Sequence, residues 1–544
     1  MIDRFGDLLD SVVQALADRC SIEGRLDAGA LDREQSACYE LAFASAELLA
    51  AREFCAAEAD GANGLDAGLA AVYVADVLLG TLDRLERIAR HLGVALDLVA
   101  DLRQAVIWHE ALGQGGFSAQ EMFGAMICAG DAFGEVSMSS DASMSFDSFA
   151  RFSTDVVRPV AEDIHRRDLV VPEELLGPMR EMGIFGLGVS ARFGGTAPDD
   201  GEDNQVMIAI TEALSEASLG AAGSLITRAE ILARAMAAGG TEAQKARFLP
   251  GIATGAPLCA ISITEPDYGS DVASLSLRAT RTDGGWLLTG AKTWCTFAGK
   301  AGLLMVVART GEKADGHKGL SIMLVEKPSF DGHDFCHEQP GGGRLTGRAI
   351  ATIGYRGMHS FDLAFENVFV PDDHLLGGEA GLGKGFYYTM AGMTGGRMQT
   401  AARACGVMRA AIGAARSYAG ERRVFGQALA DYPLTQAKVA RMAARFAACR
   451  HLTYAVGKWL DEGRGQMEAS LVKLLACRSA ELITREAQQI HGGMGYAEEM
   501  AVSRYFVDAR VLSIFEGAEE TLALKVIAKG LLERALGQGQ ARPS

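Results

Sequence analysis

Residues 263–273 read Ile-Thr-Glu-Pro-Asp-Tyr-Gly-Ser-Asp-Val-Ala, and they mark the point at which the chain changes from helical to extended patterning. The run that leads into them, LCAISIT (258–264), is short, apolar and β-branched, as strands are. Pro266 stiffens the exit from that strand, and Gly269 and Ser270 place backbone N–H groups and a hydroxyl at a tight turn. Such a turn can hold a pyrophosphate or the polar edge of a ring, although the stretch alone also fits an ordinary turn.

A second strand-like run ends in Lys-Thr-Trp-Cys-Thr at residues 292–296. Trp294 offers a flat face on which a ring can stack, and Thr296 offers a hydroxyl to a ring nitrogen. Because both runs end in groups that suit a planar polar ring, they strengthen the prediction of a cofactor site where these strands end.

Short strand patterns continue to about Pro371 and define a β domain at residues 257–375. Helical patterning fills residues 146–256, where Thr241 and Gln244 form a capping box, and it returns over residues 376–544. No alternating strand–helix units are present, so the order predicts an α+β fold and argues against a Rossmann domain.

Residues 1–145 form an Ala- and Leu-rich extension before this region. Residues 31–59 and 65–92 place apolar residues three and four apart, which is typical of amphipathic helices, and residues 130–145 look like a linker. The pattern leaves open whether the extension docks a partner or has a structural role.

The chain has 544 residues and a formal net charge of −17, so it has no general attraction for nucleic acid or anionic lipid. The sequence starts without the basic and apolar order of a signal peptide, and no uncharged run reaches the length of a membrane span. Its ten cysteines include no CxxC pair and no metal-ligand spacing, so we expect no metal site. These features together predict a cytoplasmic, reduced protein.

Five motifs occur in one order along the chain: TEPDYGSD (264–271), KTWCT (292–296), ERRVFG (421–426), QIHGGMGY (489–496) and FEGAEET (515–521). In this order they resemble the signature of the acyl-CoA dehydrogenase family. The resemblance implies a helical domain, a central β domain and a C-terminal four-helix bundle that bind FAD. It also implies an acyl-CoA substrate, electron-transferring flavoprotein as electron acceptor, and a homodimer or homotetramer.

The resemblance assigns site residues by position. The residues expected to bind FAD are Ile263, Thr264, Gly269, Ser270, Trp294, Thr296, Arg422, Phe425, Gln489, Gly492 and Gly493. Ser270, Arg397 and Gly517 are expected to contact substrate. Two positions depart from the family pattern: Pro433 stands where Gln is usual, and Ala518 stands where Thr is common.

Glu516 is the expected catalytic base. It follows an apolar strip and precedes a glycine, so its backbone can approach a ligand closely. A second family arrangement puts the base beside Arg397, but residues 394–397 hold no carboxylate. Glu519 and Glu520 are expected on a solvated helix face instead.

Residues 347–365, 384–397 and 432–438, together with the extension, narrow the resemblance to a bacterial branch of the family. That branch implies oxidation of (2S)-methylsuccinyl-CoA to mesaconyl-CoA in the ethylmalonyl-CoA pathway. The alternatives are another short acyl-CoA, such as isovaleryl- or glutaryl-CoA, or a flavin-bearing, DNA-associated relative without acyl-CoA turnover. The acidic charge and the presence of Glu516 disfavour the last of these.

Overall fold

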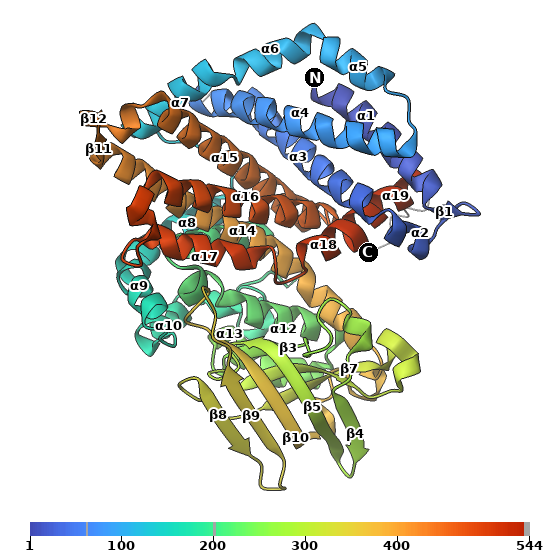
Figure 1. The fold of residues 1–544 in the computed structure, drawn as a ribbon. Helices are drawn as coiled ribbons and strands as arrows, with labels where there is room; N and C mark the ends of the chain where they lie inside the picture. Colours follow the sequence, from blue (N-terminus) through green and yellow to red (C-terminus); the bar gives the residue numbers. More distant parts are fainter. Residues whose placement is uncertain (61–63, 200–202, 538–544) are drawn as a thin grey trace. The chain divides into compact units, whose positions relative to one another are not determined.

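The strands predicted between residues 257 and 375 form one eight-stranded sheet in the computed structural model, which describes residues 1–60, 64–199 and 203–537. The strands are β3 (Cys259–Ser262), β4 (Arg278–Thr282), β5 (Gly285–Thr296), β6 (Leu303–Arg309), β7 (Leu320–Glu326), β8 (Asp334–Glu338), β9 (Arg344–Ala349) and β10 (Ser360–Pro371). Neighbours run in the order β3-β6-β4-β5-β10-β9-β8, with β7 paired to β6 (Figure 1). Strand β3 is parallel to β6, and β5, β10, β9 and β8 pair antiparallel in succession.

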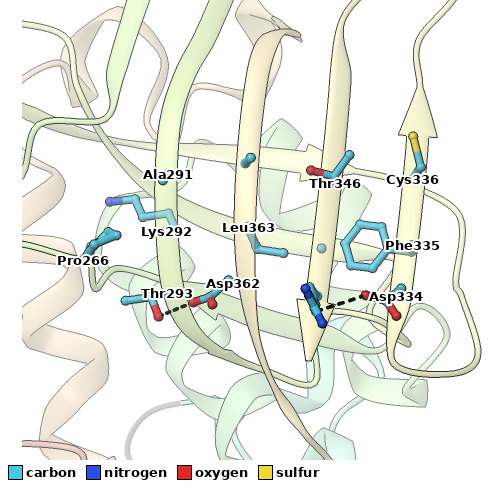
Figure 2. Close-up of a pocket in the computed structure, with 13 residues that line it drawn as sticks. Pro266, Ala291, Lys292, Thr293, Asp334, Phe335, Cys336, Thr346, Asp362 and Leu363 are labelled. Atoms are coloured by element: carbon cyan, nitrogen blue, oxygen red, sulfur yellow. Dashed lines mark hydrogen bonds and ion pairs between the residues drawn. The ribbon is translucent and has the colours of Figure 1, made fainter. Parts of the chain in front are cut away.

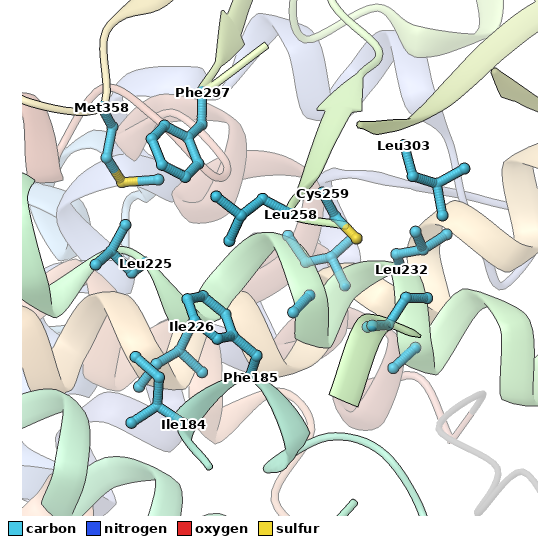
Figure 3. Close-up of a cluster of buried hydrophobic side chains, with 14 of the residues drawn as sticks. Ile184, Phe185, Leu225, Ile226, Leu232, Leu258, Cys259, Phe297, Leu303 and Met358 are labelled. Carbon is cyan, nitrogen blue, oxygen red and sulfur yellow. The ribbon is translucent and has the colours of Figure 1, made fainter. Parts of the chain in front are cut away.

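Strand β6 is buried along its whole length, because both faces of the sheet are covered there. Leu303, Met305 and Val307 pack into a core that they share with the neighbouring helices, while the alternate residues Leu304 and Val306 pack into a second core on the other face. Figure 3 shows the first core, in which Leu303 and Cys259 from the sheet meet Leu232 and Phe185. The sheet therefore lies inside a layered domain.

The helices that contribute to that first core form the region predicted at residues 146–256. They are η1 (Ser153–Val157), α9 (Arg158–Arg166), α10 (Glu173–Glu181), η2 (Ile184–Gly186), η3 (Ala191–Phe193), α11 (Asn204–Ala217), η4 (Leu219–Gly223), α12 (Ile226–Gly239) and α13 (Glu242–Thr254). The predicted capping box is confirmed, since Thr241 Oγ1 accepts from Gln244 N at 3.2 Å and Gln244 Oε1 accepts from Thr241 N at 3.0 Å. Short helical turns lie among and after the strands: η5 (Val272–Ser274), η6 (Lys313–Gly319), η7 (Asp372–His374) and η8 (Gly378–Gly381).

The extension is helical, as predicted. It comprises α1 (Ile2–Arg19), the small hairpin β1 (Ser21–Ile22) and β2 (Arg25–Leu26), α2 (Ala28–Arg33), α3 (Gln35–Asp60), α4 (Gly64–Leu92), α5 (Asp97–Gln104), α6 (Val106–Gln114) and α7 (Phe117–Ala129). Helix α8 (Ser140–Phe152) then leads out of it. By length and composition α4 could cross a membrane, but 67% of its most apolar stretch is buried inside the structure, as in a core helix.

The C-terminal region is also helical. Its elements are α14 (Gly385–Glu421), β11 (Arg423–Val424), β12 (Gln427–Ala428), η9 (Leu429–Asp431), α15 (Pro433–Asp461), α16 (Glu468–Ile490), η10 (Gly492–Tyr496), α17 (Ala501–Leu512), α18 (Glu519–Thr521), η11 (Leu522–Ala528) and α19 (Lys529–Ala535). Pro433 occupies the first turn of α15, where its missing N–H leaves no helical bond unmade.

The chain divides into two compact units, residues 1–145 with 400–544, and residues 146–399. One border falls between Ser145 and Phe146, inside α8, and the other falls inside α14. Residues 140–145, which the sequence predicts to be part of a linker, belong to the start of α8. In the first unit the extension and the C-terminal helices share one core. The ring of Phe54 stacks on His451 at 4.7 Å, and Gly124 lies so close to the backbone of Gln436 that a Cβ there would clash.

Candidate active site

Trp294 stands out on the sheet because a large aromatic side chain is 55% exposed within a strand whose neighbouring positions are buried. The register between β5 and β10 shifts here, since Phe361 pairs with Cys295 and Leu363 with Lys292. This bulge puts Trp294 in the left-handed region, at φ 57°, and turns its side chain outward. An exposed flat ring held at a bulge can receive a planar ligand, as the sequence predicts.

The end of strand β3 lies beside Trp294. Thr264 O accepts from Thr293 N at 2.9 Å, so Ile263 and Thr264 follow β3 directly alongside the KTWCT motif. Thr296, at the end of β5, is 8% exposed, and its Oγ1 lies 3.0 Å from the hydroxyl of Ser360. The structure therefore brings the four predicted flavin-ring residues to adjoining strand ends.

A buried ion pair supports these strand ends. Lys292 Nζ donates to Ile263 O at 2.7 Å and to Glu265 Oε1 at 2.8 Å. Glu265 also accepts from Ser276 N at 2.7 Å and from Leu277 N at 2.8 Å, which are on the far side of the turn that carries Gly269 and Ser270. Burial raises the pKa of Glu265, but Lys292 and these donors outweigh it, so the net pKa is lowered. The two charges thus tie both ends of the turn to β5.

The turn itself is open. Gly269 and Ser270 are exposed, and a Cβ added at Gly269 would meet nothing within 4 Å. A hollow of about 800 Å³ lies nearby on the faces of β5, β8, β9 and β10 (Figure 2). Pro266, Lys292 and Thr293 line it, but no residue predicted to contact cofactor or substrate does.

The loop that carries Glu516 runs from Ser513 to Ala518 between α17 and α18. Glu519 N donates to Ser513 O at 3.0 Å, which closes the loop. Glu516 and Gly517 both have left-handed backbones, at φ 53° and 98°. Lys473 of α16 is 1% exposed and donates to Phe515 O at 2.7 Å and to Gly517 O, the carbonyls on either side of Glu516.

The Glu516 side chain is held by α14. Thr400 Oγ1 donates to Glu516 Oε2 at 2.5 Å, and both terminal nitrogens of Arg403 lie 3.4 Å from Glu516 Oε1. Arg403 is fully buried, and the Glu516 side chain is 8% exposed. A buried positive charge favours the ionised carboxylate, which is the form that can accept a proton.

Four other predicted residues lie in the same unit as Glu516 and are exposed: Arg422, Gln489, Gly492 and Gly493. Phe425 lies in the turn between β11 and β12, and its side chain is fully exposed. Phe425 and Gly426 have φ 48° and 94°, the positive values of a tight hairpin turn that fits the twist of its strands.

Two arginines of the other unit, Arg397 and Arg228, lie on helices and are largely buried. Arg397, which the sequence predicts near the substrate, lies on α14, where burial lowers its pKa. Arg228 of α12 is 8% exposed, and its Nη1 donates to Ser224 O at 3.2 Å. No motif points to Arg228, although arginine is a residue type that is rarely buried.

One group of possible metal ligands brings together Asp168, His333 and His359, whose ligand atoms lie within 4.8 Å of one another. Asp168 Oδ1 already accepts from His359 at 3.1 Å and lies 3.5 Å from Arg356 Nε. The Arg356 guanidinium would compete with a metal ion for the Asp168 carboxylate. We therefore interpret the three residues as a hydrogen-bonded polar cluster and assign no metal to them.

Glu519 differs from its prediction. It is 8% exposed rather than on a solvated face, and it bonds to Arg478 of α16 and Tyr39 of α3. The sequence gives no sign of these contacts, or of those that Thr400, Arg403 and Lys473 make around Glu516, because the partners are far apart along the chain.

The chain belongs to the acyl-CoA dehydrogenase family. Models of three domains of that family match it in chain order: the N-terminal domain at residues 139–256, the middle domain at 260–368 and the C-terminal domain at 383–532. The predicted family, fold and cofactor are confirmed, and the chain is an FAD-dependent oxidoreductase.

Among individual relatives, the chain is 40% identical to the (2S)-methylsuccinyl-CoA dehydrogenase of Cereibacter sphaeroides over 403 residues, which cover 74% of this chain and 71% of that one. It is 34% identical to the benzylmalonyl-CoA dehydrogenase of Aromatoleum aromaticum, over 70% of this chain and 96% of that one. The solved structure of butyryl-CoA dehydrogenase from Megasphaera elsdenii is similar with a TM-score of 0.66 and 29% identity, covering 73% of this chain and 100% of that one.

Proposed function

We propose that the chain oxidises (2S)-methylsuccinyl-CoA to mesaconyl-CoA, with Glu516 as the base that removes the α-proton. The observation that carries the base is the loop 513–518, which presents a single buried carboxylate fixed by Thr400 and Arg403. The relative at 40% identity supports the substrate, and a second relative is named for another branched dicarboxylyl thioester. We place the reaction in the ethylmalonyl-CoA pathway.

In this reaction the α-proton passes to Glu516, and the β-hydrogen leaves with its electron pair. FAD, when bound, supplies the hydride acceptor that no side chain can provide. We expect Ile263, Thr264, Trp294 and Thr296 to hold its ring, because they lie on adjoining strand ends. We assign Gly269 and Ser270 to the turn shared by FAD and CoA, and the N–H of Glu516 to the thioester oxygen, where a donor stabilises enolate charge.

The distal carboxylate of the substrate requires a cation or several donors. Arg397 and Arg228 are the candidates, because each is a largely buried guanidinium in the helices of residues 146–399. Ser270 and Gly517 are the other expected substrate contacts. Tyr387 and Tyr388 are further possible donors, and the side chain of Thr394, a third, lies outside the described residues.

We further propose that electrons leave to electron-transferring flavoprotein and that the enzyme is a homodimer or homotetramer. A fully exposed Phe425 at the tip of a tight hairpin supports a second copy as its partner, since burying a phenylalanine side chain in an interface contributes about 1.5–3 kcal/mol. In that assembly Arg422, Phe425, Gln489, Gly492 and Gly493 would bind the FAD of the neighbouring copy. A cytoplasmic location suits ten free cysteines.

Anaerobic flavin bleaching tests both the proposed substrate and the proposed base. Purified protein with FAD is mixed with methylsuccinyl-, isovaleryl-, glutaryl- and butyryl-CoA, and the loss of flavin absorbance is followed. We expect methylsuccinyl-CoA to bleach fastest. Bleaching by isovaleryl-CoA but not by methylsuccinyl-CoA would overturn the substrate.

The base is tested with Glu516→Gln, because an amide cannot accept the proton. We expect the bleaching rate to fall about 100- to 10,000-fold, which is the contribution that a general base typically makes. Glu520→Gln is the matched control, because Glu520 is exposed on the same segment. Undiminished bleaching in Glu516→Gln would remove Glu516 from the mechanism.

A further inference from the structure

A residue of the extension touches the segment that carries the base. Tyr39 of α3 donates its hydroxyl to Glu519 Oε1, and Arg478 Nη2 donates to Tyr39 at 3.1 Å. Arg478 Nε also donates to Glu519 Oε2 at 3.2 Å. We propose that Tyr39 is a positioning residue for Glu516, acting through Glu519, so that the extension helps to set the geometry of the base; this rests on the proposed function.

Several neighbouring contacts restrict the motion of Tyr39, Arg478 and Glu519. Glu519 is 8% exposed, and bonds to a buried carboxylate are stronger than bonds between neutral groups. The ring of Tyr39 lies 5.2 Å from that of Phe43, and Phe43 in turn lies 5.3 Å from Arg478 and 5.5 Å from Arg84. Aromatic and cation–aromatic contacts therefore hold both groups that grip Glu519.

Glu519 passes this constraint to the base through the backbone. Its N–H donates to Ser513 O at 3.0 Å and closes the loop, in which Glu516 is three residues away. Helix α16 also fixes the loop, since Glu481 accepts from the Ser513 hydroxyl and Lys473 binds the carbonyls beside Glu516. Thr400 and Arg403 of α14 hold the Glu516 side chain. Tyr39, through its bond to Glu519, adds a contact from the extension to those that fix the loop.

If Tyr39 lost its hydroxyl, Glu519 would still be bonded to Arg478, but its side chain would be held less firmly. The Arg478 side chain is 43% exposed and has several rotatable bonds, whereas a tyrosine has two. Burial and Glu519 raise the pKa of Tyr39 to about 12, so the phenol remains a donor over the physiological range. We therefore expect a loosened loop rather than an unfolded one when the hydroxyl is removed.

The test compares Tyr39→Phe with Tyr73→Phe in the full-length holoenzyme. Tyr73 of α4 is 1% exposed in the same extension, and none of the described residues hydrogen-bonds to its hydroxyl, so the substitution is chemically matched. Amide hydrogen exchange over residues 513–519 is the first measurement. We expect exchange about 3- to 10-fold faster in Tyr39→Phe than in Tyr73→Phe, because local opening sets the rate.

Single-turnover flavin reduction is the second measurement. At saturating thioester we expect the rate of Tyr39→Phe to fall about 3- to 10-fold, with the apparent Kd for thioester changed by less than about 2-fold, because orientation rather than binding is lost. Glu519→Gln should shift both measurements in the same direction.

Unchanged exchange in both Tyr39→Phe and Glu519→Gln, or equal effects of Tyr39→Phe and Tyr73→Phe on the reduction rate, would overturn the proposal. A wild-type protein that no thioester bleaches would instead overturn the proposed function. The exchange experiment then still decides whether Tyr39 holds the loop, because it needs no turnover.

Discussion

Glu516 shows how a single residue is kept in an unfavourable conformation. A left-handed backbone costs a residue with a side chain roughly 1–2 kcal/mol, and φ is 53° here. Lys473 compensates by binding the carbonyls on both sides. The backbone strain therefore lies at the residue whose carboxylate must be oriented for catalysis. Strained backbone conformations are commonly found at active sites.

The Thr400 hydroxyl fixes one oxygen of that carboxylate. We expect Thr400→Val to slow flavin bleaching about 10-fold with FAD content unchanged, because a small misplacement of a reacting group is costly. Thr484→Val is the control, since that buried hydroxyl bonds to Ala480 O in its own helix. Equal bleaching rates in the two variants would show that Thr400 does not orient the base.

A second single residue, Lys327, makes the free energy of unfolding depend on pH. Burial lowers its pKa from the ordinary 10.5 to about 7, although its Nζ contacts the rings of Phe330 and Phe335. Between those values the unfolded chain binds the extra proton, so the free energy of unfolding rises with pH from about 7 to 10.

Urea titrations at pH 7 and pH 9.5 test this. We expect the wild type to gain about 3 kcal/mol relative to Lys327→Met over that interval. Parallel pH profiles for the two proteins would mean that Lys327 remains charged in the folded state.

At the scale of elements, the Glu265–Lys292 pair joins the end of β3, the turn 266–275 and strand β5. Lys292→Met leaves a buried carboxylate without its counter-charge, which we expect to cost about 3–5 kcal/mol and to weaken FAD binding. The double variant Lys292→Met/Glu265→Gln should recover part of the stability, since no lone charge remains.

Thermal unfolding and an FAD fluorescence titration check this prediction. Arg278→Met is the control, because Arg278 and Glu312 form an exposed pair, and such pairs contribute about 0–1 kcal/mol. Additive effects in the double variant, or FAD affinity equal to that of the control, would contradict a supporting role for the pair.

The elements also show what a sequence can reveal. The strands and the capping box at Thr241 follow from patterns within a few residues, so local chemistry predicts them. The β11–β12 hairpin at ERRVFG is not predicted, because the sequence pattern there indicates helix. The bulge that exposes Trp294 depends on pairing with β10, and the burial of Glu519 depends on a tyrosine in α3. Such features require distant segments to meet, and no local pattern records that.

For the whole molecule, the shared core of residues 1–145 and 400–544 bears on the role of the extension. Side chains such as Leu41, Phe54, Leu69 and Leu82 are fully buried, and each contributes about 1.5–3 kcal/mol when removed from water. Deleting residues 1–145 should therefore expose a large apolar face of the C-terminal helices.

We expect the truncated chain 146–544 to lose cooperative thermal unfolding and to aggregate, as measured by circular dichroism and light scattering. Wild-type full-length protein, handled in parallel, is the reference. A truncated chain that stays monodisperse, binds FAD and bleaches with substrate would identify the extension as a docking module instead.

The first compact unit is built from the two ends of the chain, with residues 146–399 between them. During synthesis, helices α1 to α7 leave the ribosome long before α15 and α16, which complete their core. At roughly 5–20 residues per second the wait is on the order of tens of seconds. Newborn chains of this enzyme therefore carry an uncovered apolar surface through most of their translation, and the first unit can complete its core only after α15 and α16 have been made.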